Sequence, residues 1–511
     1  MLRDERGSIT VFAMFIFIII LMVGGMAVDI MRYETERVKL QNTADRAVLA
    51  AGSLRQPNDP EEVVREYFRR EGLEANLVDV KITEGLNFRT VNVQTSSVMP
   101  TMFMKLLGIN ELRMTPVSAS EERYSKVEVA LVLDLSNSMN SFSRIDNLRD
   151  AGADFVDTLF ENAEPDQVSL SIIPYTGQVN LGPVFSQYFN ITPRLTQSQC
   201  VDFHPSVYTS MAIAPGANLT GTGHFDPWHT TATPQMFFCP THTSARGEMV
   251  VMSGDPSFLR SRVSNLMADG NTSIEIGVKW AAALLDPAMR PVITDMIANG
   301  HVSSDFAGRP LDYDDPDVLK VMVIMTDGEN FEQWMMAESY KTGWAPIVQN
   351  NNDGRLSVYH SGISGSNKWY RPHNESWSDR AWGASSSSTL GPNTQLTWDQ
   401  VWTMHTVRWV ARYLYPTNAT RGNRTINQWV DTILSRRSAS VKNEHLASIC
   451  STVRARDIPI FTVAFEAPDA GVAAMRMCAT SQSHFFDVNG TDIRGAFRAI
   501  AGTINRLRLT Q

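Results

Sequence analysis

The pattern of apolar and polar residues first sets apart an N-terminal rod. Residues 9–28, with the sequence ITVFAMFIFIIILMVGGMAV, carry no charged side chain. A helix of this length crosses a hydrocarbon core of about 30 Å, because each residue adds about 1.5 Å. The helical pattern continues beyond the apolar run. We therefore predict a transmembrane helix over residues 9–28, a helical stalk over residues 29–56 and a cytoplasmic tail over residues 1–8.

A cleaved signal peptide is the competing interpretation of the same run. Signal peptides usually have an apolar region of roughly 7–15 residues that ends at a small-residue cleavage site. The run in this chain is longer and helix-forming residues follow it at once, so we favour a retained anchor. Basic residues stand on both sides of it, so the positive-inside rule gives little guidance. The four cysteines suit disulfides in an oxidising compartment, which favours export of the larger, C-terminal part.

The next segment, residues 57–125, has the pattern of a small α+β module. Residues 61–72 have the spacing of an amphipathic helix, whereas residues 78–85 and 88–97 alternate as half-buried strands do. An apolar stretch, TMFMKLLGI, comes next, and residues 112–122 follow as another strand candidate. The module therefore combines one helix with three strand candidates.

Beyond residue 126, strand-like and helix-like segments alternate. Four strand-like segments recur, and the first of them is nearly continuously apolar, as expected for a parallel strand buried on both faces. They are residues 126–134, 168–176, 318–327 and 458–466. The alternation predicts an α/β fold with a doubly wound, mainly parallel sheet over residues 126–511. Two long insertions interrupt this domain at about residues 182–255 and about residues 330–424.

The second insertion is rich in Ser, Asn, Gly and Trp. Disordered segments are poor in aromatic residues, so we expect this insertion to be folded. Its tryptophans fit two alternatives. They form a binding surface, because aromatic residues are enriched at interfaces, or they fill a separate core beneath a long excursion.

Candidate chemistry begins at the end of the first apolar strand, in the sequence Asp134-Leu135-Ser136-Asn137-Ser138. Alone, such a loop is also a good helix cap. Thr272 stands before a predicted helix, however, and Asp327 follows another apolar strand. In open α/β sheets, ligands lie outside the carboxyl ends of the strands, so these loops can meet at one edge.

This grouping predicts a metal site made only of oxygen ligands. Its candidate residues are Asp134, Ser136, Ser138, Thr272 and Asp327. Hard oxygen ligands suit Mg²⁺ above all, with Mn²⁺ or Ca²⁺ as alternatives. Two carboxylates do not fill an octahedron, so water or a carboxylate from a partner protein would complete the coordination.

The same motifs carry a family resemblance. The sequence DLSNS, the threonine after Gly-Asn, and TDG, in that order, are similar to the metal-ion-dependent adhesion site of von Willebrand factor type A domains. The resemblance implies that Ser136, Ser138 and Thr272 bind the ion directly, and that Asp134 and Asp327 act largely through water.

The two ends of the chain carry a second resemblance. The segments RGSITVFAMFIF, AVD and LQNTADRAVLAAGS, and the C-terminal AFRAIAGTINRLRLTQ, resemble TadG-type proteins of bacterial Flp (tight adherence) pilus systems. This resemblance implies a single-pass protein of the cytoplasmic membrane with a large periplasmic part. It also implies pilus or envelope components as partners and a role in pilus assembly, anchoring and surface attachment.

The cysteines leave two interpretations open. Cys200 and Cys239 have His204 and His242 close by in sequence, which permits a Cys₂His₂ zinc site as well as a disulfide. We favour the disulfide outside the cytoplasm, and we predict a second one between Cys450 and Cys478.

Several functional classes are disfavoured by what the chain lacks. The net charge of −9 comes without any block of like charges, which argues against nucleic acid as a partner. The sequence contains no G-x-S-x-G, P-loop or H-E-x-x-H motif, so we do not expect an enzyme. Two alternatives to the adhesion hypothesis stay open, an envelope scaffold or stalk whose metal site is incidental, and a metal-dependent hydrolase.

Overall fold

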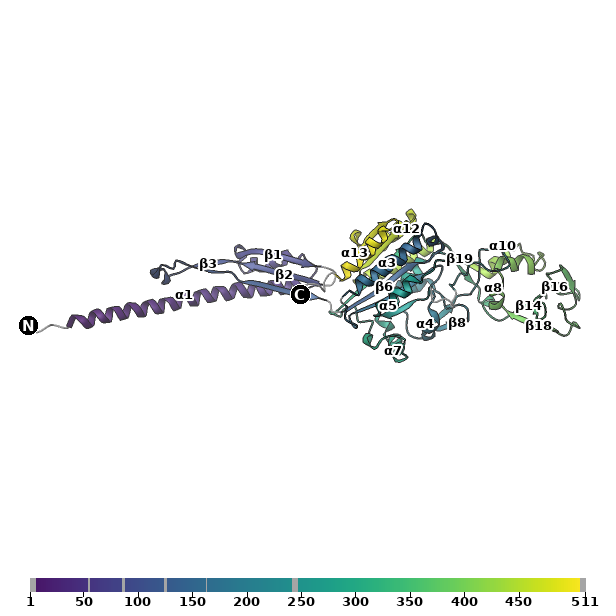
Figure 1. Cartoon of the computed structure of the whole chain (residues 1–511), viewed down its shortest axis with the longest axis horizontal. Helices are drawn as coiled ribbons and strands as arrows, with labels where there is room; N and C mark the ends of the chain where they lie inside the picture. Colours follow the sequence, from purple (N-terminus) through teal and green to yellow (C-terminus); the bar gives the residue numbers. More distant parts are fainter. Residues whose placement is uncertain are drawn as a thin grey trace, which may run out of the picture. The chain divides into compact units, whose positions relative to one another are not determined.

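The computed structural model describes residues 6–53, 56–84, 88–123, 126–161, 163–240 and 247–505 (Figure 1). It divides into two compact units, Met1–Tyr124 and Ser125–Asn505. Each unit has its own hydrophobic core.

The first unit is built on one long helix, α1 (Arg6–Gly52). Within the described residues, it is the helix long and apolar enough to cross a membrane. Its N-terminal half exposes its apolar side chains, whereas Leu40, Ala44 and Ala51 are buried in the core of the module. These residues recur at helical spacing and so form one packed face.

The remainder of this unit combines α2 (Pro60–Arg70) with two small antiparallel sheets. One sheet has the order β1 (Leu77–Glu84), β2 (Phe88–Thr95) and β5 (Val117–Arg123), and the other pairs β3 (Ser97–Pro100) with β4 (Glu111–Met114). The prediction of one strand over residues 112–122 is wrong, because β4 and β5 separate at Pro116. Proline has no N–H for a sheet hydrogen bond.

The second unit contains the predicted α/β sheet, and its six strands have the order β11-β7-β6-β12-β20-β21. They are β6 (Lys126–Asp134), β7 (Val168–Tyr175), β11 (Val250–Ser253), β12 (Val318–Thr326), β20 (Ile460–Phe465) and β21 (Phe485–Val488). All neighbours are parallel except β11, which pairs antiparallel with β7. Because the chain continues from β6 to β7 on one side and later returns to β12 on the other, the strand order reverses between β6 and β12.

Helices pack against this sheet as the alternating pattern predicts. The helices α6 (Ile274–Leu285), α11 (Ala439–Arg454) and α12 (Asp469–Cys478) share a core with the β6 residues Ala130 and Val132. A Cβ atom at Gly277 would lie 2.8 Å from Val132, so glycine allows α6 to approach the sheet closely. The helices α3 (Arg144–Leu159), α5 (Pro256–Ser264) and α13 (Asp492–Asn505) form another packed group.

The two insertions are folded. The first contains a small sheet of β8 (Asn190–Thr192), β9 (Val201–Asp202) and β10 (Asn218–Gly221). The second contains a five-stranded antiparallel sheet of β14 (Trp344–Asn350), β15 (Leu356–Tyr359), β16 (Trp369–Arg371), β17 (Ser376–Ser378) and β18 (Asn393–Thr397). Trp334, Trp398 and Trp402 are buried in its separate core, together with Trp429 of α10 (Ile426–Ile433). These tryptophans therefore stabilise the excursion from within.

All four cysteines form disulfides. Cys200 pairs with Cys239 within the first insertion, and Cys450 pairs with Cys478 between α11 and α12. Both predicted pairings are confirmed, so neither Cys200 nor Cys239 is free to bind zinc. His204 bonds instead with Ser206 through its Nδ1 atom, and His242 lies outside the described residues.

Candidate functional site

The candidate site lies where the strand order reverses. Leu133 of β6 is in register with Met325 of β12, so Asp134 and Asp327 follow directly at the same carboxyl edge. The loop before α6 brings Thr272 to this edge, where the N–H of Asn137 donates to the carbonyl of Gly270 at 2.9 Å. The sheet and two short connections thus gather residues far apart in sequence.

Asp134 is fully buried and accepts three hydrogen bonds. Its Oδ1 accepts from the Ser136 backbone N–H at 2.8 Å. Its Oδ2 accepts from Thr326 Oγ1 at 2.6 Å and from the Tyr175 hydroxyl at 3.1 Å. Burial raises the pKa of Asp134 to about 7, and the negative charge of Asp327 adds to the effect.

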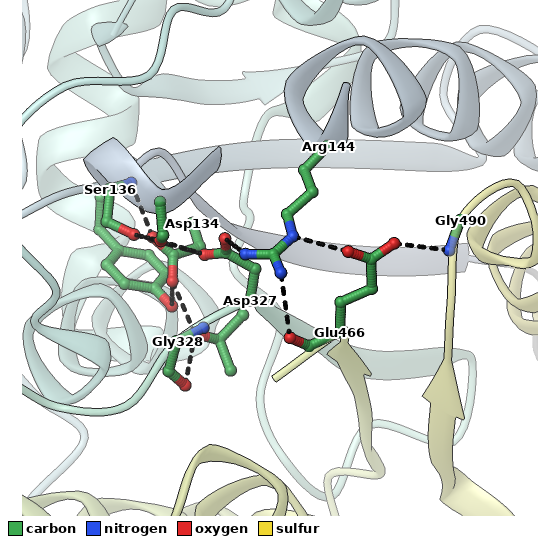
Figure 2. Close-up of polar contacts among 10 residues, drawn as sticks. Asp134, Ser136, Arg144, Asp327, Gly328, Glu466 and Gly490 are labelled. Carbon is green, nitrogen blue, oxygen red and sulfur yellow. Dashed lines mark hydrogen bonds and ion pairs between the residues drawn. The ribbon is translucent and has the colours of Figure 1, made fainter. Parts of the chain in front are cut away.

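Asp327 lies beside Ser136 (Figure 2), and it is also hydrogen-bonded to Ser138. Its Oδ1 accepts from Ser138 Oγ at 2.8 Å and from Ser136 Oγ at 3.4 Å, and the two serine Oγ atoms are 2.9 Å apart. Burial raises the pKa of Asp327, while the hydrogen bonds from Ser138 and Arg144 oppose this rise. Two buried carboxylates therefore share one polar cluster.

Arg144, the first residue of α3, joins this cluster to a third strand end. Its Nη1 donates to Asp327 Oδ2 at 2.9 Å and its Nε donates to Glu466 Oε2 at 2.8 Å. The other oxygen of Glu466 accepts from the backbone N–H of Gly490 at 2.9 Å (Figure 2). The hydrogen bond from Arg144 lowers the pKa of Glu466. The guanidinium thus compensates one oxygen of Asp327 and leaves the other to the serines.

Thr272 completes the predicted set. A Cβ atom at Gly328 would lie 3.4 Å from Thr272 Oγ1 and 3.9 Å from Ser138 Oγ, so the two hydroxyls lie near the same backbone position. Behind them, the buried Lys442 donates to the carbonyls of Thr272 and Phe331 at 2.8 and 2.6 Å. Lys442 therefore ties the Thr272 loop to the loop that follows Asp327.

The hydroxyls of Ser136, Ser138 and Thr272 belong to residues that line a cavity of about 360 Å³. Asp134 accepts a hydrogen bond from the Ser136 backbone N–H, and Asp327 accepts from the hydroxyls of both serines. Three further lining residues, Trp228, His229 and Met236, come from the first insertion. Asp226 fixes their loop, because its carboxylate accepts from the backbone N–H groups of Trp228, His229 and Met236. The insertion therefore contributes to the wall of the site.

The arrangement fits a small hard cation. The Oγ atoms of Ser136 and Ser138, which are 2.9 Å apart, match the edge of an octahedron whose metal–oxygen bonds are about 2.0–2.1 Å. Within the described ranges, no group of three or more His, Cys, Asp or Glu side chains gathers as a metal cluster. An ion bound here would therefore depend on hydroxyls and two carboxylates.

Sequence reasoning missed four residues that shape the site. They are Arg144, Tyr175, Lys442 and Glu466. Tyr175 and Glu466 stand at the carboxyl ends of apolar strands, as Asp134 and Asp327 do. The rule that ligands lie outside these strand ends could therefore have identified them. Lys442 is a charged residue among the buried positions of α11, and such a residue needs a polar partner.

Comparison with known families concerns the N-terminal region. Residues 7–54 match the Tad family, described as "Putative Flp pilus-assembly TadE/G-like". The matched segment comprises the apolar run and the helix that continues it. No curated protein sequence is significantly similar to the chain.

Comparison with solved structures gives matches among pilus proteins. The vWF domain of the type V pili tip protein Mfa5 from Porphyromonas gingivalis is 13% identical with a TM-score of 0.32, covering 76% of this chain and 98% of that chain. The pilus adhesin SpaC from Lactobacillus rhamnosus GG is 13% identical with a TM-score of 0.28, covering 83% of this chain and 34% of that one. The adhesive tip pilin GBS104 from Group B Streptococcus agalactiae is 11% identical with a TM-score of 0.29, covering 75% and 98%.

Proposed function

From a TadE/G-like N-terminal region joined to a von Willebrand factor type A-like α/β domain, we propose a membrane-anchored protein of Flp pilus assembly or anchoring. Residues 9–28 hold it in the cytoplasmic membrane, and the larger part lies in the periplasm. Its binding site is the cluster around Asp134 and Asp327, which recognises an acidic residue of a pilus or envelope component. Surface attachment follows from that recognition.

The observation that supports this proposal is the meeting of five oxygen-bearing residues where the strand order reverses. Ser136, Ser138 and Thr272 line one cavity, and the two carboxylates are hydrogen-bonded to one or both of the serines. We assign direct contact with a divalent cation, Mg²⁺ above all, to the hydroxyls, and contact through water to Asp134 and Asp327. The cation would supply a Lewis-acidic position for the partner's carboxylate.

The residues of the chain perform three tasks in this scheme. Thr326 and Tyr175 hold the Asp134 carboxylate by hydrogen bonds, and Lys442 holds the Thr272 loop. Arg144 balances part of the charge of Asp327. The walls of the cavity, including Trp228 and Met236, limit which acidic segment can enter.

The test is the combined substitution Asp134→Ala and Asp327→Ala in the full chain. We expect partner capture from membrane extracts to be lost, chelator to reproduce that loss in the wild type, and pili to become scarce in electron micrographs. Asp431→Ala, an exposed carboxylate on α10, is the matched control. Unchanged capture and piliation in the double variant would exclude the metal-dependent mechanism.

A scaffold role is the second candidate, and the Arg144 contacts favour it. This guanidinium links the loops after β6, β12 and β20 without an added ion, so the cluster also has a purely structural use. In that case, deletion of residues 2–28 would abolish piliation while the double alanine variant would assemble pili normally.

A further inference from the structure

Within the first unit, the hairpin of β3 and β4 ends in an unusually apolar tip. The 3₁₀ turn Met104–Leu107 forms this tip, which we define as residues 101–109. Its exposed large apolar side chains are Met102, Phe103, Leu106, Leu107 and Ile109, and Leu106 is 76% exposed. An exposed apolar patch of this kind on a small module marks a site of contact with a protein or a membrane.

The tip is fixed against α1, as Figure 1 shows for the hairpin that lies along this helix. Phe103 packs on Gly25, where an added Cβ atom would lie 2.5 Å from the ring. Asp29 of α1 accepts the backbone N–H groups of Phe103 and Met104 at 2.7 and 2.8 Å, and that of Met102 at 3.0 Å. A glycine and a buried carboxylate thus hold the tip at one level of the helix.

The tip contacts α1 at the C-terminal end of residues 9–28, the run that carries no charged side chain. The run ends at Val28 and Asp29 is the first charged residue after it. Gly25 lies three residues earlier, about 4.5 Å inside the run at 1.5 Å per residue. If residues 9–28 span the hydrocarbon core, Phe103 reaches the depth of its outer edge.

We propose that residues 101–109 are a second membrane contact, which inserts its apolar side chains into the outer surface of the bilayer beside α1. The proposal rests on the proposed anchoring by residues 9–28. Lipid is the occupant because the tip lies at the level where the exposed apolar surface of α1 ends, and Val28 and Ile30, which flank Asp29 on the helix, are also exposed. Lys105 is the one charged residue in the tip, and a lysine at this depth extends its amine to the headgroups.

The experiment measures the depth of spin labels on the full-length protein in vesicles of phosphatidylcholine and phosphatidylglycerol. The label is placed at Leu106→Cys in the tip, at Val23→Cys in the span, and at Val78→Cys as matched control. Val78 is 63% exposed on β1 of the same module, and all native cysteines are in disulfides. We expect the label at position 106 to shift, like that at position 23, toward relaxation by oxygen and away from relaxation by a water-soluble nickel chelate.

Each other outcome overturns the proposal in a distinguishable way. If position 106 behaves like position 78 while position 23 reports lipid, the tip lies in water and the anchor stands. If position 23 also reports water, the proposed anchoring fails and the membrane contact fails with it. Shielding of position 106 from both reagents would mean that another protein segment covers the tip.

Discussion

Strands β6 and β12 carry buried charges at both of their ends, and the two ends differ in charge balance. At the amino ends, Glu128 Oε2 meets Lys320 Nζ at 2.5 Å, and Lys320 also donates to the carbonyl of Leu285. At the carboxyl ends, Asp134 and Asp327 are two carboxylates in one cluster. The same pair of strands thus closes one end with opposite charges and leaves like charges at the other.

Under the proposed function, the difference assigns stabilisation of the fold to the amino ends and binding to the carboxyl ends. A buried charge costs folding free energy unless an opposite charge and hydrogen bonds compensate it. Glu128 has that compensation from Lys320 and from the N–H of Leu311 at 3.0 Å. At the other end, Arg144 is shared between Asp327 and Glu466, so under the proposed function a cation from solution would complete the charge balance of the cluster.

Removing the Glu128–Lys320 ion pair should have the largest effect, a loss of folding stability. Lys320→Met leaves Glu128 buried without its partner, and we expect the free energy of unfolding to fall by about 3–5 kcal/mol. Urea unfolding followed by tryptophan fluorescence checks this, because every tryptophan lies in the second unit. The double variant Glu128→Met with Lys320→Met should recover most of the loss. Equal stability of the single variant and the wild type would contradict the comparison.

Removing a charge from the Asp134 and Asp327 cluster should leave the fold intact and weaken the binding of a divalent ion. Asp134→Asn keeps the shape of the side chain and removes its charge, so we expect affinity for Mn²⁺ to fall about 10–100-fold. Equilibrium dialysis of the full-length protein in detergent gives the affinity, and urea unfolding gives the stability. A destabilisation as large as that of Lys320→Met, with ion affinity unchanged, would reverse the assignment of the two ends.

A change at Arg144 tests the charge balance of the carboxyl ends, because this guanidinium offsets part of the negative charge of Asp327. Arg144→Met removes a positive charge from Asp327, and we expect the affinity for Mn²⁺ to rise about tenfold through the loss of repulsion. Arg260→Met is the control, since this arginine pairs with Asp157 on the surface. Weaker ion binding in Arg144→Met would mean that the guanidinium positions Asp327 for the ion.

The pH dependence of ion affinity should be no larger than the effect of Arg144→Met. The ion-free fold keeps a proton on Asp134 between the ordinary carboxyl value of 3.8 and about 7. The unfolded chain has lost this proton, so stability falls as pH rises through that interval. An ion must displace the same proton, so its affinity should rise by about tenfold between roughly pH 6 and 8. Titrations of the wild type should show this slope, and Asp134→Asn should show a weaker one, because the raised pKa of Asp327 remains.

Much of the fold was predictable because its signals are local. The apolar runs of β6 and β12 are continuous in sequence, and Asp134 and Asp327 come directly after them. The partners of these residues were harder to predict, because Arg144 reaches Glu466 across 322 positions of the chain. The sequence offered a separate core as one of two alternatives for the tryptophans of the second insertion, but its five-stranded sheet was hard to predict, since its short strands contain few of the alternating residues that identify a sheet.

The continuity of α1 has a mechanical consequence. The same helix that exposes apolar side chains over residues 9–28 buries Leu40, Ala44 and Ala51 in the core of the module. Under the proposed anchoring, there is no swivel between lipid and module, because an α-helix resists twisting and stretching along its hydrogen-bonded length. A pull or a torque on the module is therefore passed directly to the helix in the bilayer.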